Sequence, residues 1–163
     1  MIDLHRSTRI ALLTTLSLIL FLLEGMISLP LPVPGAKLGL AAVATLIALE
    51  ILPHTRDALT VLLLRILLAS FLGGGPAPML YSLAGGLGSF LAMVFLKKHT
   101  SLSIISISAA GGFMHNIAQL TVAAIVMQTA ALFFYAPVLG LIGTAAGVGI
   151  GLLSQSVCQK ICR

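Results

Sequence analysis

Charged residues are scarce in this sequence. Only 8% of its 163 residues are Asp, Glu, Lys or Arg, 59% are hydrophobic, and the mean hydropathy is +1.16. A soluble domain carries about 25% charged residues. The composition therefore excludes an ordinary soluble domain and predicts an all-α integral membrane protein, folded as a single domain over residues 1–163.

Acidic residues are the scarcest charged residues, which limits the chemistry available to the chain. Asp3 and Asp57 are the two aspartates, and neither has an acidic neighbour in the sequence. A prenyl diphosphate synthase of the usual kind needs clustered aspartates to hold Mg²⁺ against pyrophosphate. The chain also has no GK[ST] phosphate loop, HExxH or GxSxG motif. We therefore predict that it is not an enzyme by itself, and we predict no metal or cofactor.

Cysteines are few, and the basic residues form no extended cluster. Cys158 and Cys162 are the two cysteines, and two ligands alone make a poor metal site, so we interpret them as an inert helical pair. The net charge of +5 is spread along the chain. Membrane topology explains such a distribution better than nucleic-acid binding does.

Long apolar runs, by contrast, are abundant. A membrane-crossing helix needs about 20 apolar residues, and proline, glycine and charge divide this chain into six such runs. The first follows the basic segment HRSTR, and we interpret it as a membrane span because no small-residue cleavage site follows it at a suitable distance. The predicted spans are residues 8–29, 36–52, 57–73, 77–96, 102–128 and 131–155.

Basic residues predict the orientation of these spans. They gather on one side of a six-span arrangement, at Arg6, Arg9, Arg56, Lys97, Lys98, Lys160 and Arg163. Lysine and arginine mark the cytoplasmic side of membrane proteins, and Lys37 alone lies near the opposite face. We therefore predict a multi-pass protein of the cell's inner (cytoplasmic) membrane, with six transmembrane helices and both termini in the cytoplasm.

Polar side chains at membrane depth are the candidate site. Such residues are costly to insert, so they face the protein interior and often mark a function. Arg65 lies deep in the third span, and the fifth span carries three polar residues spaced to share one helix face. Lys37 and Tyr81 lie nearer the outer side. Together with the residues of the third and fifth spans, they predict an outward-facing pocket for a small amphipathic, anionic molecule. The predicted substrate-binding residues are Lys37, Arg65, Tyr81, His115, Asn116 and Gln119.

Structural interpretations remain open beside this one. Arg65 pairs with Glu24 or Glu50 in one alternative, and Arg56 neutralises Glu50 in another. The polar residues of the fifth span also suit hydrogen bonding between helices, and Lys37 suits a position at the outer interface. Gly143, Gly147 and Gly151 recur every four residues on one face, which indicates helix packing within the chain or contact with a partner.

Four ordered segments carry a resemblance to a known family: PGAKLGLAAVATLIAL (34–49), LLRILLASFLGG (63–74), YSLAGGLGS (81–89) and GGFMHNIAQL (111–120). They resemble the Gx transporter family, also called heptaprenyl diphosphate synthase component I. That family is similar to the substrate-binding S components of energy-coupling-factor (ECF) transporters. The resemblance implies six helices, an outward-facing pocket, and work with a membrane T component and two ATPase subunits.

The resemblance also implies a partner surface. S components contact the T subunit through an alanine-x-x-x-alanine face of the first helix, and the matching positions here are Ser7, Ala11 and Thr15. These residues are small but are not the standard alanine pair.

Two functions follow from the sequence. The first is a substrate-binding subunit for ATP-driven uptake of a flavin, a quinone precursor or a prenyl phosphate. The alternative is a non-catalytic membrane subunit of a heptaprenyl diphosphate synthase in an isoprenoid-quinone pathway. A stand-alone carrier is a third, weaker interpretation, because the chain is short and has no evident internal repeat. In each case the lipid bilayer surrounds the chain.

Overall fold

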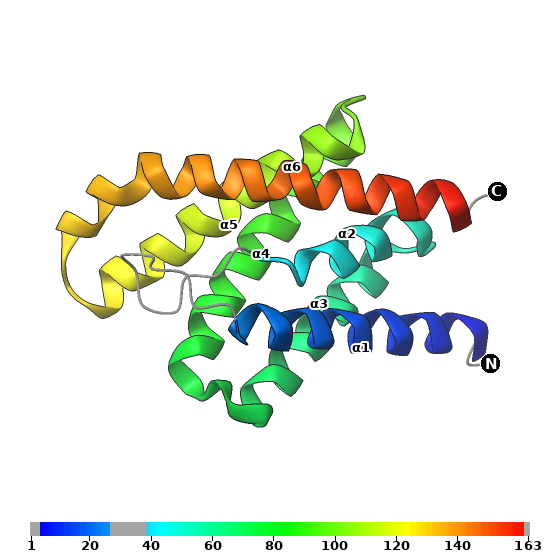
Figure 1. The fold of residues 1–163 in the computed structure, drawn as a ribbon, viewed down its shortest axis with the longest axis horizontal. Coiled ribbons are helices and arrows are strands. Elements are labelled where there is room, and N and C mark those ends of the chain that lie inside the picture. The colour runs from blue at the N-terminus through cyan, green and yellow to red at the C-terminus, as the bar shows by residue number, and fades with distance from the viewer. Residues whose placement is uncertain (1–3, 27–38, 162–163) are drawn as a thin grey trace.

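The computed structural model describes residues 4–26 and 39–161. Within these ranges the chain forms a bundle of α-helices (Figure 1). A π-helix, Ser70–Gly74, extends the third helix, and a 3₁₀-helix, Ala130–Tyr135, precedes the last one. The helices are α1 (Leu4–Met26), α2 (Ala42–Ile51), α3 (Thr55–Ala69), α4 (Pro76–His99), α5 (Ile104–Val126) and α6 (Ala136–Ile161).

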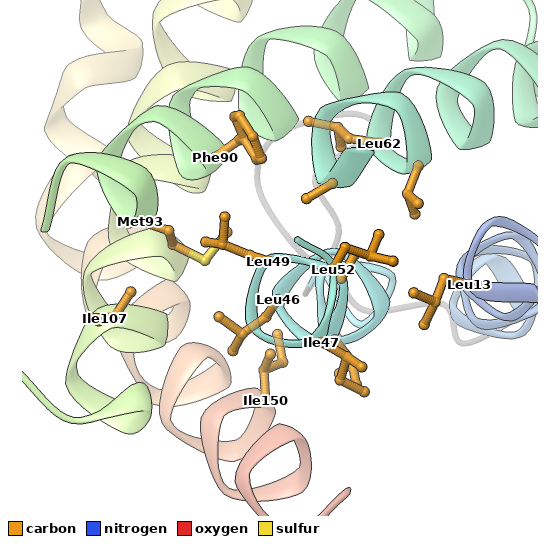
Figure 2. Packing of buried hydrophobic residues seen from close by; sticks show 14 of the residues in the cluster. Leu13, Leu46, Ile47, Leu49, Leu52, Leu62, Phe90, Met93, Ile107 and Ile150 are labelled. Atoms are coloured by element: carbon orange, nitrogen blue, oxygen red, sulfur yellow. The ribbon is translucent and has the colours of Figure 1, made fainter. Parts of the chain in front are cut away.

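Helix α2 lies at the centre of the bundle. Its residues 43–49 are all buried, as expected for a helix that is apolar on every side. Figure 2 shows α2 nearly end-on, with side chains of the other helices around it. The labelled neighbours are Leu13 of α1, Leu62 of α3, Phe90 and Met93 of α4, Ile107 of α5 and Ile150 of α6. The hydrophobic core is therefore organised around the shortest of the α-helices.

Helices α5 and α6 pack with their backbones in contact. A Cβ atom added to Gly147 would lie 2.4 Å from the carbonyl oxygen of Ser108, and one added to Gly143 would lie 2.4 Å from that of Gly112. At Gly151 the nearest atom would be the Cα of Ile105, at 2.7 Å. The glycine stripe predicted from the sequence therefore packs inside the chain, against α5, as small residues do where membrane helices approach closely.

Charged contacts gather several helix ends at one end of the molecule. Arg6 donates through Nε to Oδ2 of Asp57 at 2.9 Å, and through Nη2 to Oδ1. This pair joins the start of α1 to the start of α3. Lys97 Nζ lies 3.0 Å from Oε1 of Glu50 and donates to the carbonyl oxygen of Leu49 at 2.7 Å, which joins the ends of α4 and α2. The start of α1 and the end of α6 lie at this same end (Figure 1), which we call the basic end.

Four of the helices are long and apolar enough to cross a membrane, so the chain is a multi-pass membrane protein. They are α1, α4, α5, and α6 together with the 3₁₀-helix before it. Their positions agree with the first, fourth, fifth and sixth spans expected from the sequence.

The expected span over residues 36–52 was wrong in its extent. Within the described residues the helix begins at Ala42, after Gly39, whose φ of +84° lies in the left-handed region that favours glycine. Ten helical residues extend about 15 Å, half of a bilayer core. Helix α3 is also short, with 15 residues, although its π-helical extension carries it to Gly74, close to the expected span over 57–73.

Candidate functional site

A small polar cavity lies among α1, α2, α3, α4 and α5. Its volume is about 20 Å³, which is room for about one water molecule. The polar residues that line it are Glu24, Thr45, Arg65, Ser82, Ser89, His115 and Gln119, and Phe21 is among the apolar ones. Three of the residues predicted from the sequence, on two different helices, therefore face one internal space.

Three of the polar residues that line the cavity lie away from the basic end. Glu24 is near the last residue of α1, Arg65 is in the last turns of α3, and Gln119 is in the second half of α5. Each of these helices has its opposite end at the basic end, where the pairs Arg6–Asp57 and Lys97–Glu50 lie. The cavity thus extends from the middle of the bundle, where Met93 and Leu62 line it, toward the end opposite the basic residues.

Arg65 places a guanidinium in the wall of this cavity. The residue is only 4% exposed, and its Cζ lies 5.6 Å from the centroid of the Phe21 ring, a cation–π distance. Among the described residues its Nε has no hydrogen-bond partner, and no ion pair within 4.0 Å is formed with Glu50. The carboxylate of Glu24 lines the same cavity and interacts with the guanidinium electrostatically, without a hydrogen bond to its Nε. A buried cation without a bonded anion is costly, so this group is suited to receive one.

His115 and Gln119 lie against α4 because that helix has a glycine where they approach it. A Cβ on Gly85 would lie 2.7 Å from Cγ of Gln119 and 2.8 Å from Cε1 of His115. Both side chains are buried. Within the described chain, Oε1 of Gln119 has no hydrogen-bond partner, and the His115 ring lies against the backbone of Gly85 with no well-aligned hydrogen bond from either nitrogen. Two further polar groups are therefore available to a bound molecule.

Glu24 has a structural task beside the cavity. Its Oε1 accepts from the backbone N–H of Gly39 at 2.6 Å, and its Oε2 accepts from that of Leu40 at 3.0 Å. Amides before the first turn of a helix need such acceptors. Glu24 thus holds the start of α2 from the side of α1.

The remaining predicted residues lie elsewhere in the described structure. Asn116 donates from Nδ2 to the carbonyl oxygen of Leu139 at 2.7 Å and so links α5 to α6. Tyr81 is partly buried and packs against the cluster of Leu120, Ala123 and Leu139. Neither residue is among those that line the cavity. Lys37 lies outside the described residues.

The structure also shows the partner of Glu50 and the surroundings of the small residues on α1. Glu50 pairs with Lys97 rather than with Arg65 or Arg56. Ser7, Ala11 and Thr15 are exposed along one face of α1, and the Thr15 hydroxyl donates to the carbonyl oxygen of Ala11 at 2.9 Å. This face packs against none of the other described helices.

Sequence reasoning missed the aromatic and the hydroxyl-bearing residues of the lining, which are Phe21, Thr45, Ser82 and Ser89. Serine and threonine are common in membrane helices and satisfy themselves locally, so their type alone gave no signal. A spacing signal was nevertheless present on α4, where Ser82, Gly86, Ser89 and Met93 recur every three or four residues and all line the cavity.

The arrangement offers recognition rather than covalent chemistry. It combines a cation, an imidazole, an amide and hydroxyl groups at the end of an apolar core, which suits the polar end of an amphipathic anion. Among the described residues, no group of three or more His, Cys, Asp or Glu is placed to hold a metal ion.

The fold and the cavity define a multi-pass helical membrane protein with an internal polar site. A protein-family model described as heptaprenyl diphosphate synthase component I matches residues 13–157, and the chain belongs to that family. Comparisons with curated proteins and with solved structures give no match. The description names one component of a synthase, which agrees with the expectation that this chain is not an enzyme by itself.

Proposed function

We propose that this chain is a substrate-binding membrane subunit for ATP-driven uptake of a small amphipathic anion. The observation that supports this most directly is the buried guanidinium of Arg65, which shares one cavity with His115 and Gln119 and has no bonded anion among the described residues. An anionic group would convert this costly arrangement into a charge-assisted hydrogen-bonded one.

The membrane orientation that we propose depends on the position of the basic end relative to the cavity. We infer six membrane crossings with both termini in the cytoplasm, because the basic end would face the cytoplasm under the positive-inside rule. The cavity would then lie in the outer half of the inner (cytoplasmic) membrane and accept its ligand from outside. Lys37, in the chain between α1 and α2, would add positive charge to the same side.

Uptake also requires the cavity to enlarge. Pockets for ligands of drug size measure about 300–1,000 Å³, whereas this cavity measures about 20 Å³. We propose that the present arrangement is the closed one and that a flavin, a quinone precursor or a prenyl phosphate enters when the helices around Arg65 separate. The exposed face of Ser7, Ala11 and Thr15 would contact a T component, which joins the chain to two ATPase subunits.

Native mass spectrometry of the protein extracted gently from its own membranes tests this proposal. We expect a bound anionic molecule that is lost in a folded Arg65→Ala or His115→Ala variant and retained in Thr121→Val. The control residue lies on α5, and its hydroxyl donates to the carbonyl oxygen of Ile117, away from the cavity. A wild-type protein that stays empty after soaking with flavin, quinone precursors and prenyl phosphates would contradict the proposal.

The description of the family favours a second candidate, a non-catalytic membrane subunit of a heptaprenyl diphosphate synthase. In that case the chain would hold a soluble catalytic partner at the membrane surface, and its basic end would face such a partner. Co-purification separates the two functions. ATPase subunits and a T component in the complex support the first, and a soluble prenyl synthase supports the second.

A further inference from the structure

We infer that the ligand of this cavity carries a hydrogen-bond donor beside its anionic group. This inference rests on the proposed binding function and narrows its substrate class. It favours acids with a neighbouring O–H or N–H group over ligands whose polar end consists of ionised oxygens alone.

The polar groups without partners are of two opposite kinds. Nε of Arg65 can only donate, so it calls for an acceptor, and an anion is the strongest one. Oε1 of Gln119 can only accept, so it calls for a donor. Both groups belong to side chains that line the same cavity and are at least 95% buried, with exposures of 4% and 5%.

His115 strengthens the demand for a donor. Its ring lies against the backbone of Gly85, and within the described chain neither nitrogen has a well-aligned hydrogen bond. Because a neutral imidazole has one nitrogen that donates and one that accepts, a contact with Gly85 could occupy at most one of them. Thr45 also lines the cavity, and its buried hydroxyl has no hydrogen-bond partner. A hydroxyl can either donate or accept a hydrogen bond. A ligand made only of acceptors would leave the Gln119 oxygen and one His115 nitrogen buried and unsatisfied.

One water molecule does not satisfy this set. A buried water makes about three hydrogen bonds, and the cavity has room for about one water. A group with an anionic oxygen and an adjacent donor matches both kinds of partner at once. 2-Hydroxy acids, in which an O–H lies beside an ionised carboxylate, have this pattern, whereas a fully ionised phosphate or diphosphate does not.

A matched series of probes isolates the donor. Octanoate, 2-hydroxyoctanoate and 2-methoxyoctanoate share the charge and the apolar chain, but only the second has an O–H beside the carboxylate. We would measure their binding to the full-length protein in nanodiscs by isothermal titration calorimetry. We expect 2-hydroxyoctanoate to bind roughly tenfold more tightly than 2-methoxyoctanoate, because the latter leaves buried acceptors unpaired. Gln119→Met should remove most of this preference, while Thr121→Val should keep it.

The outcomes separate this inference from the proposed function. If all three acids bind with the same affinity and their binding is lost in a folded Arg65→Met variant, the anion site stands and the donor requirement is overturned. If no acid binds, or if binding persists in Arg65→Met, the anion site itself is overturned and the inference with it. The comparison of the two substituted acids on the wild-type protein decides the donor requirement even if Gln119→Met does not fold.

Discussion

Replacing Gly147 by alanine should lower the free energy of unfolding, because it forces α5 and α6 apart. The added Cβ would lie 2.4 Å from the carbonyl oxygen of Ser108, about 1 Å closer than the 3.4 Å at which ordinary contact begins. The obstacle is backbone, so no side-chain rotation relieves it. Overpacking of this kind costs about 1–3 kcal/mol, and alanine regains up to about 1 kcal/mol of helix propensity.

Gly149 provides the matched control for this prediction. It lies on the same helix two residues away, and nothing lies within 4 Å of a Cβ added there. Because the propensity gain is common to both variants, the difference between Gly147→Ala and Gly149→Ala isolates the steric cost, about 1–3 kcal/mol. Reversible unfolding in mixed micelles measures it. Equal unfolding midpoints for the two variants would refute the close packing of α5 on α6.

Three further predictions concern side chains that join helices. Arg6→Ala should destabilise the protein by about 1–3 kcal/mol, because it removes both hydrogen bonds that Arg6 donates to the buried carboxylate of Asp57. A double-mutant cycle with Asp57→Ala, measured by thermal unfolding, checks this prediction. Additive losses of stability would show that the pair is unimportant. Glu24→Gln should speed hydrogen exchange at the amides of residues 39 and 40, and unchanged exchange would contradict the capping role. Asn116→Ala should cost about 0.6–1.7 kcal/mol in unfolding without weakening 2-hydroxyoctanoate binding, and weaker binding by the folded variant would place Asn116 in the site.

Much of the architecture was predictable because membrane insertion constrains a sequence strongly. Apolar length located α1, α4, α5 and α6 to within a few residues, and the helical spacing of Gly143, Gly147 and Gly151 predicted their common packing face. Helix α2 was misjudged because hydropathy measures how apolar a segment is and not what surrounds it. A helix enclosed by protein has no bilayer thickness to match.

The site was predictable in its residue types but not in its partners. Arg65, His115 and Gln119 stood out as polar groups in apolar helices, and they do share a cavity. Periodicity alone did not separate Gln119 from Asn116, because residues three apart lie close on a helix surface and only the neighbouring helices divide them. Glu50 pairs with Lys97 because the end of α4 lies beside the end of α2. No local sequence pattern encodes that arrangement.

The capping of α2 at both ends has a consequence for how the chain enters a membrane. The amides of Gly39 and Leu40, just before its first turn, are satisfied by Glu24 of α1, and the carbonyl oxygen of Leu49 in its last turn is satisfied by Lys97 of α4. Until α4 has been synthesised, a ten-residue apolar helix would have unsatisfied backbone groups and half the length of a bilayer core. We therefore expect α2 to take its place in the bundle only after α4 has been inserted. In a chain truncated before residue 97, cysteines introduced into this segment should remain accessible to water-soluble thiol reagents.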